Sequence, residues 1–258
     1  MPTRFRISGS LKWANILAFI LTVFVNGLAG STTILGGKST AQVSDMYPTL
    51  ITPAGYVFSI WGVIYILLGI FVIYQAFAGA HGKQYRERIG WLFVSSCVLN
   101  IIWLFLWQFG YLSLSVFIMF LLLANLILIY LRLGIGKSRD AIFGRLAAHL
   151  PFSVYLGWIT IASIANVASA LVFLSLDGIV TNPVVWSTSV IIVALLITLT
   201  VLATRKDVAY TLVVIWALIG ISVKQSENSM IVVITETGAA ILAIAVVAVL
   251  IYFITRKK

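Results

Sequence analysis

Three segments of the chain carry aromatic and amide side chains at helical spacing, and these are the residues that could do chemistry. They are Tyr56, Phe58, Trp61 and Tyr65; Asn100, Trp103 and Trp107; and Tyr155, Trp158, Ala162 and Asn166. Intervals of three or four residues place each set on one face of a helix, with Tyr56 about a turn before the first stripe. Sites for apolar small molecules combine aromatic walls with a few hydrogen-bonding groups. The spacing therefore predicts that the three faces meet around a flat, hydrophobic ligand.

Two other interpretations apply to such residues in a membrane protein. Tryptophan and tyrosine gather where a helix meets the lipid headgroups, and that role fits Trp13, Trp91 and Trp186 at segment ends. It does not fit Trp158, which lies well inside its segment. Asn100 and Asn166 would be costly against lipid, so we expect them to face the interior. Linking one helix to another remains the alternative role for each amide.

The elements that must position these residues are transmembrane helices. The 258 residues are 62% hydrophobic and 9% charged, with a mean hydropathy of +1.12, far from the composition of soluble domains. A span needs about 20 apolar residues. Segments of about that length occur at 13–35, 54–78, 90–109, 111–131, 147–174, 183–203, 208–223 and 231–254. We expect an all-α, multi-pass bundle of about eight spans, of which 208–223 is the weakest because it is short.

The positive charge is unevenly distributed along the chain. Of the 17 Lys and Arg residues, all but Lys38 and Lys224 fall in the joints on one side of an eight-span bundle. The positive-inside rule then places both termini in the cytoplasm. The net charge of +10 is accounted for by this pattern, so we expect no nucleic-acid partner. A cleaved signal peptide is the alternative for the first segment, but its apolar run is long for one. We expect an integral protein of a plasma membrane.

Catalytic machinery is not recognisable in the chain. Of the seven acids only Glu236 falls within a predicted span, and no nucleotide-binding or nucleophile motif is present. We therefore expect no enzyme activity, catalytic residue, metal or cofactor. Glu236 has two interpretations: a proton or cation site of a coupled transporter, or a residue that reaches the interface or pairs with Lys224. The single cysteine, Cys97, lies in an apolar run and is expected to pack as a small hydrophobe.

The aromatic segments resemble the TspO/MBR family, the tryptophan-rich sensory proteins that include the mitochondrial translocator protein. Residues 53–69, PAGYVFSIWGVIYILLG, resemble the second helix of that family. Leu99-Asn100-Ile-Ile-Trp103 resembles L-N-x-x-W of its third helix, and residues 155–166 resemble Y-x-x-W-x-x-x-A-x-x-x-N of its fifth. One departure is Tyr56, where tryptophan is usual. The resemblance covers residues 13–176 and says nothing of 179–258.

The resemblance implies a five-helix unit with a pocket for porphyrins or sterol-like molecules beneath the loop after the first helix. Carried over by position, the ligand-binding residues are Tyr56, Phe58, Trp61, Tyr65, Asn100, Trp103, Trp158, Ala162 and Asn166. We divide the chain into this unit, 1–178, and a three-helix extension, 179–258. The extension could cover one side of the bundle, replace a homodimer contact, or form a second functional half.

The leading hypothesis is a membrane protein that binds a hydrophobic planar ligand, with a tetrapyrrole as one candidate, for transport or sensing. The alternative is a small-solute permease or channel that uses the extra helices, for which pH-dependent uptake lost in Glu236→Gln would argue. An enzyme acting on a lipophilic substrate ranks last. The expected partners are the bilayer and the hydrophobic small molecule, and homo-oligomer formation is left open.

Overall fold

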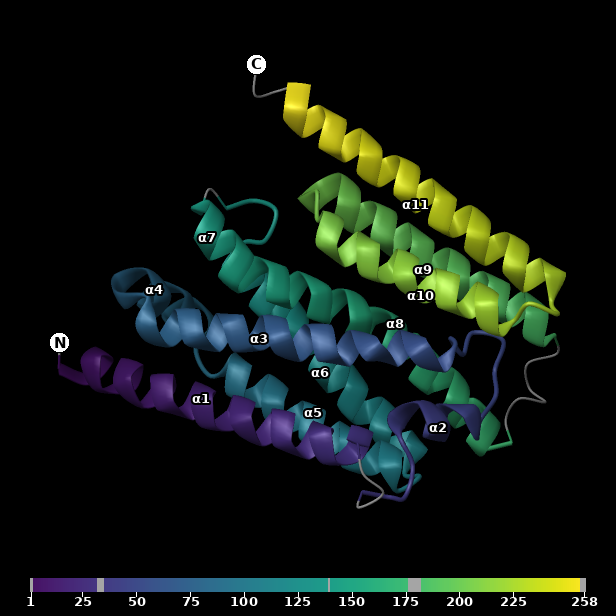
Figure 1. Ribbon diagram of the computed structural model, residues 1–258, viewed down its shortest axis with the longest axis horizontal. Helices are drawn as coiled ribbons and strands as arrows, with labels where there is room; N and C mark the ends of the chain where they lie inside the picture. Colours follow the sequence, from purple (N-terminus) through teal and green to yellow (C-terminus); the bar gives the residue numbers. More distant parts are fainter. Residues whose placement is uncertain (1, 32–34, 139, 176–181, 256–258) are drawn as a thin grey trace.

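The structure is a bundle of long helices. This computed structural model describes residues 2–31, 35–138, 140–175 and 182–255, among which there are helices, turns and loops but no strand (Figure 1). The long helices are α1 (Pro2–Ser31), α3 (Ile60–Phe77), α5 (Leu92–Gln108), α6 (Leu112–Leu133), α8 (Leu150–Phe173), α9 (Pro183–Arg205), α10 (Val208–Lys224) and α11 (Ser229–Thr255). The shorter elements are α2 (Thr40–Asp45), a 3₁₀ turn (Gly55–Ser59), α4 (Gly79–Ile89), α7 (Ile142–Gly144) and a π-helical turn (Arg145–His149).

The prediction of an all-α, multi-pass membrane bundle is confirmed, but the count of eight spans is not. Six helical stretches are long and apolar enough to cross a bilayer, and a seventh results if α4 and α5, bent by 61° at their junction, form one span. Gly90, with φ of +62°, lies at that bend. Helix α10 has 17 residues, or about 26 Å at 1.5 Å per residue, which is short for a hydrocarbon core of about 30 Å.

Local sequence explains where several helices begin. Asn182 accepts hydrogen bonds from the amides of Val184 and Val185, and Pro183 opens α9, which are the residue types favoured at these two positions. Asp207 caps α10 by accepting from the amide of Tyr210 at 3.1 Å. The span predicted over 54–78 agrees with the apolar stretch Gly55–Phe77, which opens with a 3₁₀ turn at Gly55–Ser59 before the α-helix begins at Ile60.

Helix α8 lies at the centre of the bundle. It packs against α6 on one side and against α10 on another, while α11 packs on α9 and α10 at the edge farthest from α1 (Figure 1). Glycine allows the close approach of α8 and α10: a Cβ on Gly157 would lie 3.0 Å from the backbone oxygen of Tyr210. The extension therefore packs directly on the central helix.

The two ends of the bundle differ in what they carry. Helix α1 begins and α11 ends at the same end, where α4 and α7 also lie, and α2 lies at the other end (Figure 1). We call the first the basic end. Its assignment to the cytoplasm stays a prediction, and Arg139 and residues 256–258, which contribute to it, lie outside the described residues. The division at 178/179 falls within residues 176–181, also outside them, and stays a prediction.

Candidate functional site: an aromatic cavity under a strap

The three aromatic faces meet in the bundle interior around a small cavity of about 30 Å³. Its lining includes these residues of the predicted set: Phe58, Trp61, Trp103, Trp158, Ala162 and Asn166. Ser44, Pro53, Trp107, Ile161 and Ala165 complete it. The cavity holds roughly the volume of one water molecule, because the aromatic side chains fill most of the space between the helices.

Trp61 is at the centre of the aromatic cluster. Its ring stacks on Tyr65 with centroids 5.8 Å apart and an interplanar angle of 17°, and it lies 5.8 Å from the ring of Trp103 at 31°. Trp158 meets Trp61 edge-on at 6.1 Å, and Phe58 meets Trp158 edge-on at 5.8 Å. These separations fall in the favourable range for aromatic pairs. Helices α3, α5 and α8 thus contribute rings to one continuous cluster.

The polar groups of the cluster fall into two kinds. Asn166 is buried, accepts a hydrogen bond from the Trp103 indole at 3.0 Å and donates one to Ser115 Oγ at 2.9 Å. This network fixes one edge of the cavity. The indole Nε1 of Trp158 is also buried, yet it has no acceptor among the described residues. A buried donor without a partner costs free energy, so one residue of the cavity lining carries an unused hydrogen-bond donor.

The cavity is covered by residues 39–54, which we call the strap. It starts with a capping box, in which the Ser39 side chain accepts from the Gln42 amide and the Gln42 side chain accepts from the Ser39 amide. The Trp107 indole donates to the Thr40 carbonyl at 3.2 Å, and Ser44 and Pro53 line the cavity from the strap. The strap is therefore tied to the aromatic helices at the end opposite the basic end.

Helix α10 holds the other end of the strap. The Ala54 amide donates to the Gly220 carbonyl at 2.9 Å, and Gln225 Nε2 donates to the Thr49 carbonyl at 3.0 Å. Lys224 forms an ion pair with Asp45 at 2.9 Å. The predicted pairing of Lys224 with Glu236 is thus not formed: Glu236 is exposed and accepts a hydrogen bond from Ser222 at 2.8 Å.

The structure places the remaining predicted residues outside the cavity lining. Tyr65 reaches the cluster through its stacking on Trp61. Asn100 is fully buried and accepts a hydrogen bond from Asn26 of α1 at 2.8 Å, which is a helix-to-helix link. Tyr56 packs edge-on against Trp216 of α10, with ring centroids 5.2 Å apart. It lies on the 3₁₀ turn, whose three-residue period removes it from the α-helical stripe.

Sequence reasoning missed several lining residues, and their signals differ. Trp107 belongs to the predicted stripe of Asn100 and Trp103 but not to the expected ligand-binding set. Ile161 and Ala165 lie three and seven residues beyond Trp158, and helical periodicity could have found these two. Ser44 comes from the strap, and no periodic pattern connects it to the stripes. Among the described residues, no three His, Cys, Asp or Glu side chains come together as a metal site would require.

The fold and the site are those of a multi-pass helical membrane protein with an aromatic cavity in its interior. Comparison with protein families then matches residues 12–251 to the family described as TSPO-like protein. The match covers most of the chain, which therefore belongs to the TSPO-like protein family. It extends well beyond residue 176, so α9, α10 and most of α11 lie within the matched region. Searches of curated proteins and of solved structures find no match.

Proposed function

We propose that the protein binds a planar, hydrophobic molecule at the aromatic cavity, for transport or sensing, with porphyrins and other tetrapyrroles as the first class to test. The carrying observation is the unpartnered indole nitrogen of Trp158 at a cavity walled by aromatic rings. A flat ligand with a hydrogen-bond acceptor would stack on these rings and accept from Nε1. Membership of the TSPO-like family supports this proposal.

Binding requires the rings to move apart, because the cavity of about 30 Å³ is far smaller than the few hundred Å³ of ordinary ligand pockets. Trp61 is the residue that must give way. It is only half-buried and its hydrogen-bonding atom is not part of the Asn166 network. A ligand that enters between Trp61 and the rings of Trp103 and Trp158 would exchange ring–ring contacts for ring–ligand contacts, so Trp61 stays in contact with the ligand.

The test is titration of the purified protein in nanodiscs with protoporphyrin, followed by tryptophan fluorescence. We expect saturable quenching that weakens in Trp61→Leu and in Trp158→Phe, the second of which removes the indole donor and keeps a ring. Trp13→Phe is the matched control, since Trp13 is 64% exposed on α1 and lies outside the cavity lining. It should lose fluorescence without changing the midpoint of the titration.

Asn100→Ala separates two roles of that amide. If Asn100 contacts the ligand, as the family resemblance implies, its variant weakens binding as Trp61→Leu does. If Asn100 only links α5 to α1 through Asn26, the variant lowers thermal stability and leaves the binding midpoint unchanged. Linear quenching that is equal in wild type and all variants means partitioning of the porphyrin into lipid and would overturn the proposed function.

A further inference from the structure

A second pocket lies beside the strap and shares no lining residue with the aromatic cavity. Its volume is about 380 Å³, within the range of small-molecule sites and far larger than the aromatic cavity. Its walls are the strap, the last turns of α8, the start of α9 and the end of α10. The lining consists of Pro48, Thr49, Leu50, Ala168, Leu171, Val172, Pro183, Trp186, Ser187, Lys224 and Gln225. We call it the strap pocket.

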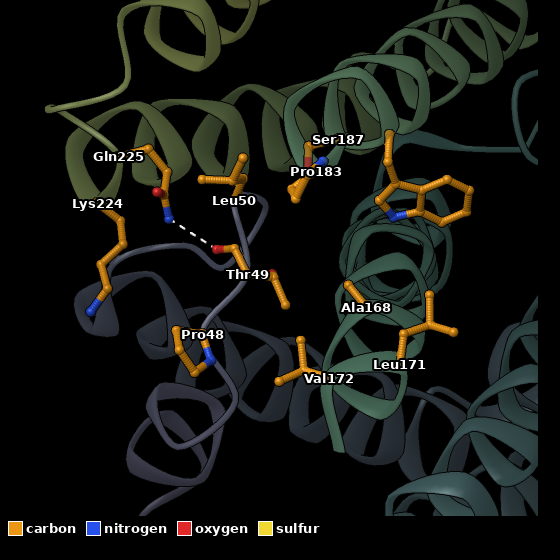
Figure 2. Close-up of a pocket in the computed structure, with 11 residues that line it drawn as sticks. Pro48, Thr49, Leu50, Ala168, Leu171, Val172, Pro183, Ser187, Lys224 and Gln225 are labelled. Atoms are coloured by element: carbon orange, nitrogen blue, oxygen red, sulfur yellow. Dashed lines mark hydrogen bonds between the residues drawn. The ribbon is translucent and has the colours of Figure 1, made fainter. Parts of the chain in front are cut away.

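The strap pocket is apolar along α8 and α9 and polar at α10. Figure 2 shows Ala168 and Leu171 on one side of the space and Lys224 on the other, with Gln225 hydrogen-bonded to Thr49 near Lys224. Ser187, on the α9 side, is buried and brings a hydroxyl to the lining. An occupant that satisfies both sides must have an apolar body and a polar head, and the head must lie at α10.

The polar side favours an anionic head group. Lys224 is the one charged residue among the described residues that line the pocket. An ammonium group has three N–H donors, and Asp45, which is outside the lining, takes one of them at 2.9 Å. The Gln225 amide nitrogen is held by the Thr49 carbonyl, so it cannot turn to a ligand without loss. A carboxylate at this edge would share the Lys224 ammonium with Asp45 and would meet no carboxylate from the lining itself.

The size of the pocket limits the apolar body. A volume of 380 Å³ equals that of about a dozen water molecules in the liquid, so the occupant has roughly that number of non-hydrogen atoms. This is fewer than a tetrapyrrole macrocycle contains and matches one medium-length hydrocarbon chain. We propose that the strap pocket binds a single-chain amphipathic carboxylate, with its head at Lys224 and its chain along Ala168, Leu171 and Trp186.

The test uses undecanoic acid with bromine on its terminal carbon, because bromine quenches a tryptophan that it touches. Titration into the full chain in nanodiscs should give saturable quenching of the wild type. Trp186→Phe should remove the saturable component, since Trp186 lines the apolar side. Trp91→Phe, at an exposed tryptophan outside the pocket, is the matched control and should keep it.

The charge of the head group is tested on both members of the ion pair. Lys224→Gln should raise the half-saturating concentration about fivefold, and Asp45→Asn should lower it about threefold, because it removes the negative charge that competes for the Lys224 ammonium. The same chain ending in an alcohol should bind wild type as weakly as the acid binds Lys224→Gln.

Other results would overturn the proposal. Linear quenching, or a saturable component that survives in Trp186→Phe, would mean that the acid only partitions into lipid or binds elsewhere. Equal binding of the acid and the alcohol would mean an apolar crevice with no anion site. Porphyrin binding at the aromatic cavity is measured separately, so failure of one proposal leaves the other standing.

Discussion

Helices α10 and α11 are both apolar and both follow residue 178, but they occupy different environments. In α10, residues such as Val214 and Ala217 are fully buried, and the helix contacts α8 and the turn Gly55–Ser59. In α11, only 22% of the membrane-spanning window is buried, and the helix packs mainly on α9 and α10. The extension is thus one helix integrated into the central packing and an outer layer around it.

This difference helps to choose among the three roles that the sequence leaves open for the extension. Helix α10 and its C-cap residue form four hydrogen bonds with the strap and the turn after it, through Trp216, Gly220, Lys224 and Gln225. If the extension were a separate functional half, α10 would have no need to bind the strap that covers the aromatic cavity. The arrangement favours the reading in which the extension covers one side of the bundle, and it makes α10 the helix on which the aromatic site depends.

The largest expected effect comes from filling the closest contact of α10. A Cβ on Gly220 would lie 2.1 Å from Cγ2 of Val57, and Val57 is fully buried, so neither side can move freely. Gly220→Ala should lower the free energy of unfolding by about 2 to 3 kcal/mol, measured as a fall in the thermal midpoint in detergent micelles.

Substitutions at two other glycines serve as controls for Gly220→Ala. A Cβ on Gly238 of α11 would meet the end of the Leu195 side chain at 2.8 Å, and a leucine can rotate away, so Gly238→Ala should cost clearly less. Gly62→Ala has nothing within 4 Å and should be neutral or slightly stabilising. If Gly238→Ala is as damaging as Gly220→Ala, then α10 and α11 do not differ as the packing indicates.

Removal of Asp207 should be next in size. This buried carboxylate caps α10 and accepts from Ser153 Oγ of α8 at 2.7 Å. Asp207→Ala should cost about 2 kcal/mol, because it removes the cap and leaves a buried hydroxyl unpaired. Ser153→Ala keeps the cap and should cost about half as much in the same thermal unfolding measurement. Equal costs would mean that the cap contributes nothing.

Loss of the Trp216 indole should lower the stability of the protein by a smaller amount. The indole donates to the Val57 carbonyl at 3.3 Å and packs on Tyr56. Trp216→Phe keeps a ring and loses the bond, which should cost about 1 kcal/mol. On α11, Ile244 is 71% exposed, and Ile244→Ala should leave the thermal midpoint unchanged in micelles. A clear fall in the thermal midpoint of Ile244→Ala would instead indicate that this face of α11 packs against another molecule in micelles.

The smallest expected effect on stability is at Asp140. This carboxylate lies outside the extension and serves as a reference for Asp207. Burial alone would raise the pKa of Asp140, but the hydrogen bond and charge of Arg88, 3.0 Å away, outweigh it and lower the pKa below its ordinary value. A lowered folded-state pKa stabilises the fold above the unfolded value of about 3.9, and this is lost as pH falls through the folded-state pKa.

Asp140→Asn should therefore destabilise the protein by about 1 kcal/mol or less at neutral pH, and the difference from wild type should shrink as the pH is lowered below about 4. Thermal midpoints across this pH range measure it. Glu87→Gln is the control, since Glu87 is half-exposed and pairs with Lys83 at 3.8 Å. A difference that is constant with pH would argue against a charge effect at Asp140.

The sequence by itself determined the membrane bundle, most helix positions and the aromatic stripes. Composition is sufficient to predict the membrane bundle, because long, continuously apolar segments can cross a bilayer only as helices. Periodicity is sufficient for the stripes, since residues three or four apart share a face in any helix. The caps at Asn182 and Asp207 could also be predicted, because capping depends on neighbours within three residues.

Only the tertiary structure decided which side chains meet. The place of Tyr56 against Trp216, the link from Asn100 to Asn26, and the pairing of Lys224 with Asp45 each join residues far apart in the chain. Lipid-facing and interior helix faces are both mainly apolar in a membrane protein, so hydrophobicity does not distinguish α10 from α11. Close approach at small residues such as Gly157 and Gly220 distinguishes them, and that fit exists only once the helices are packed.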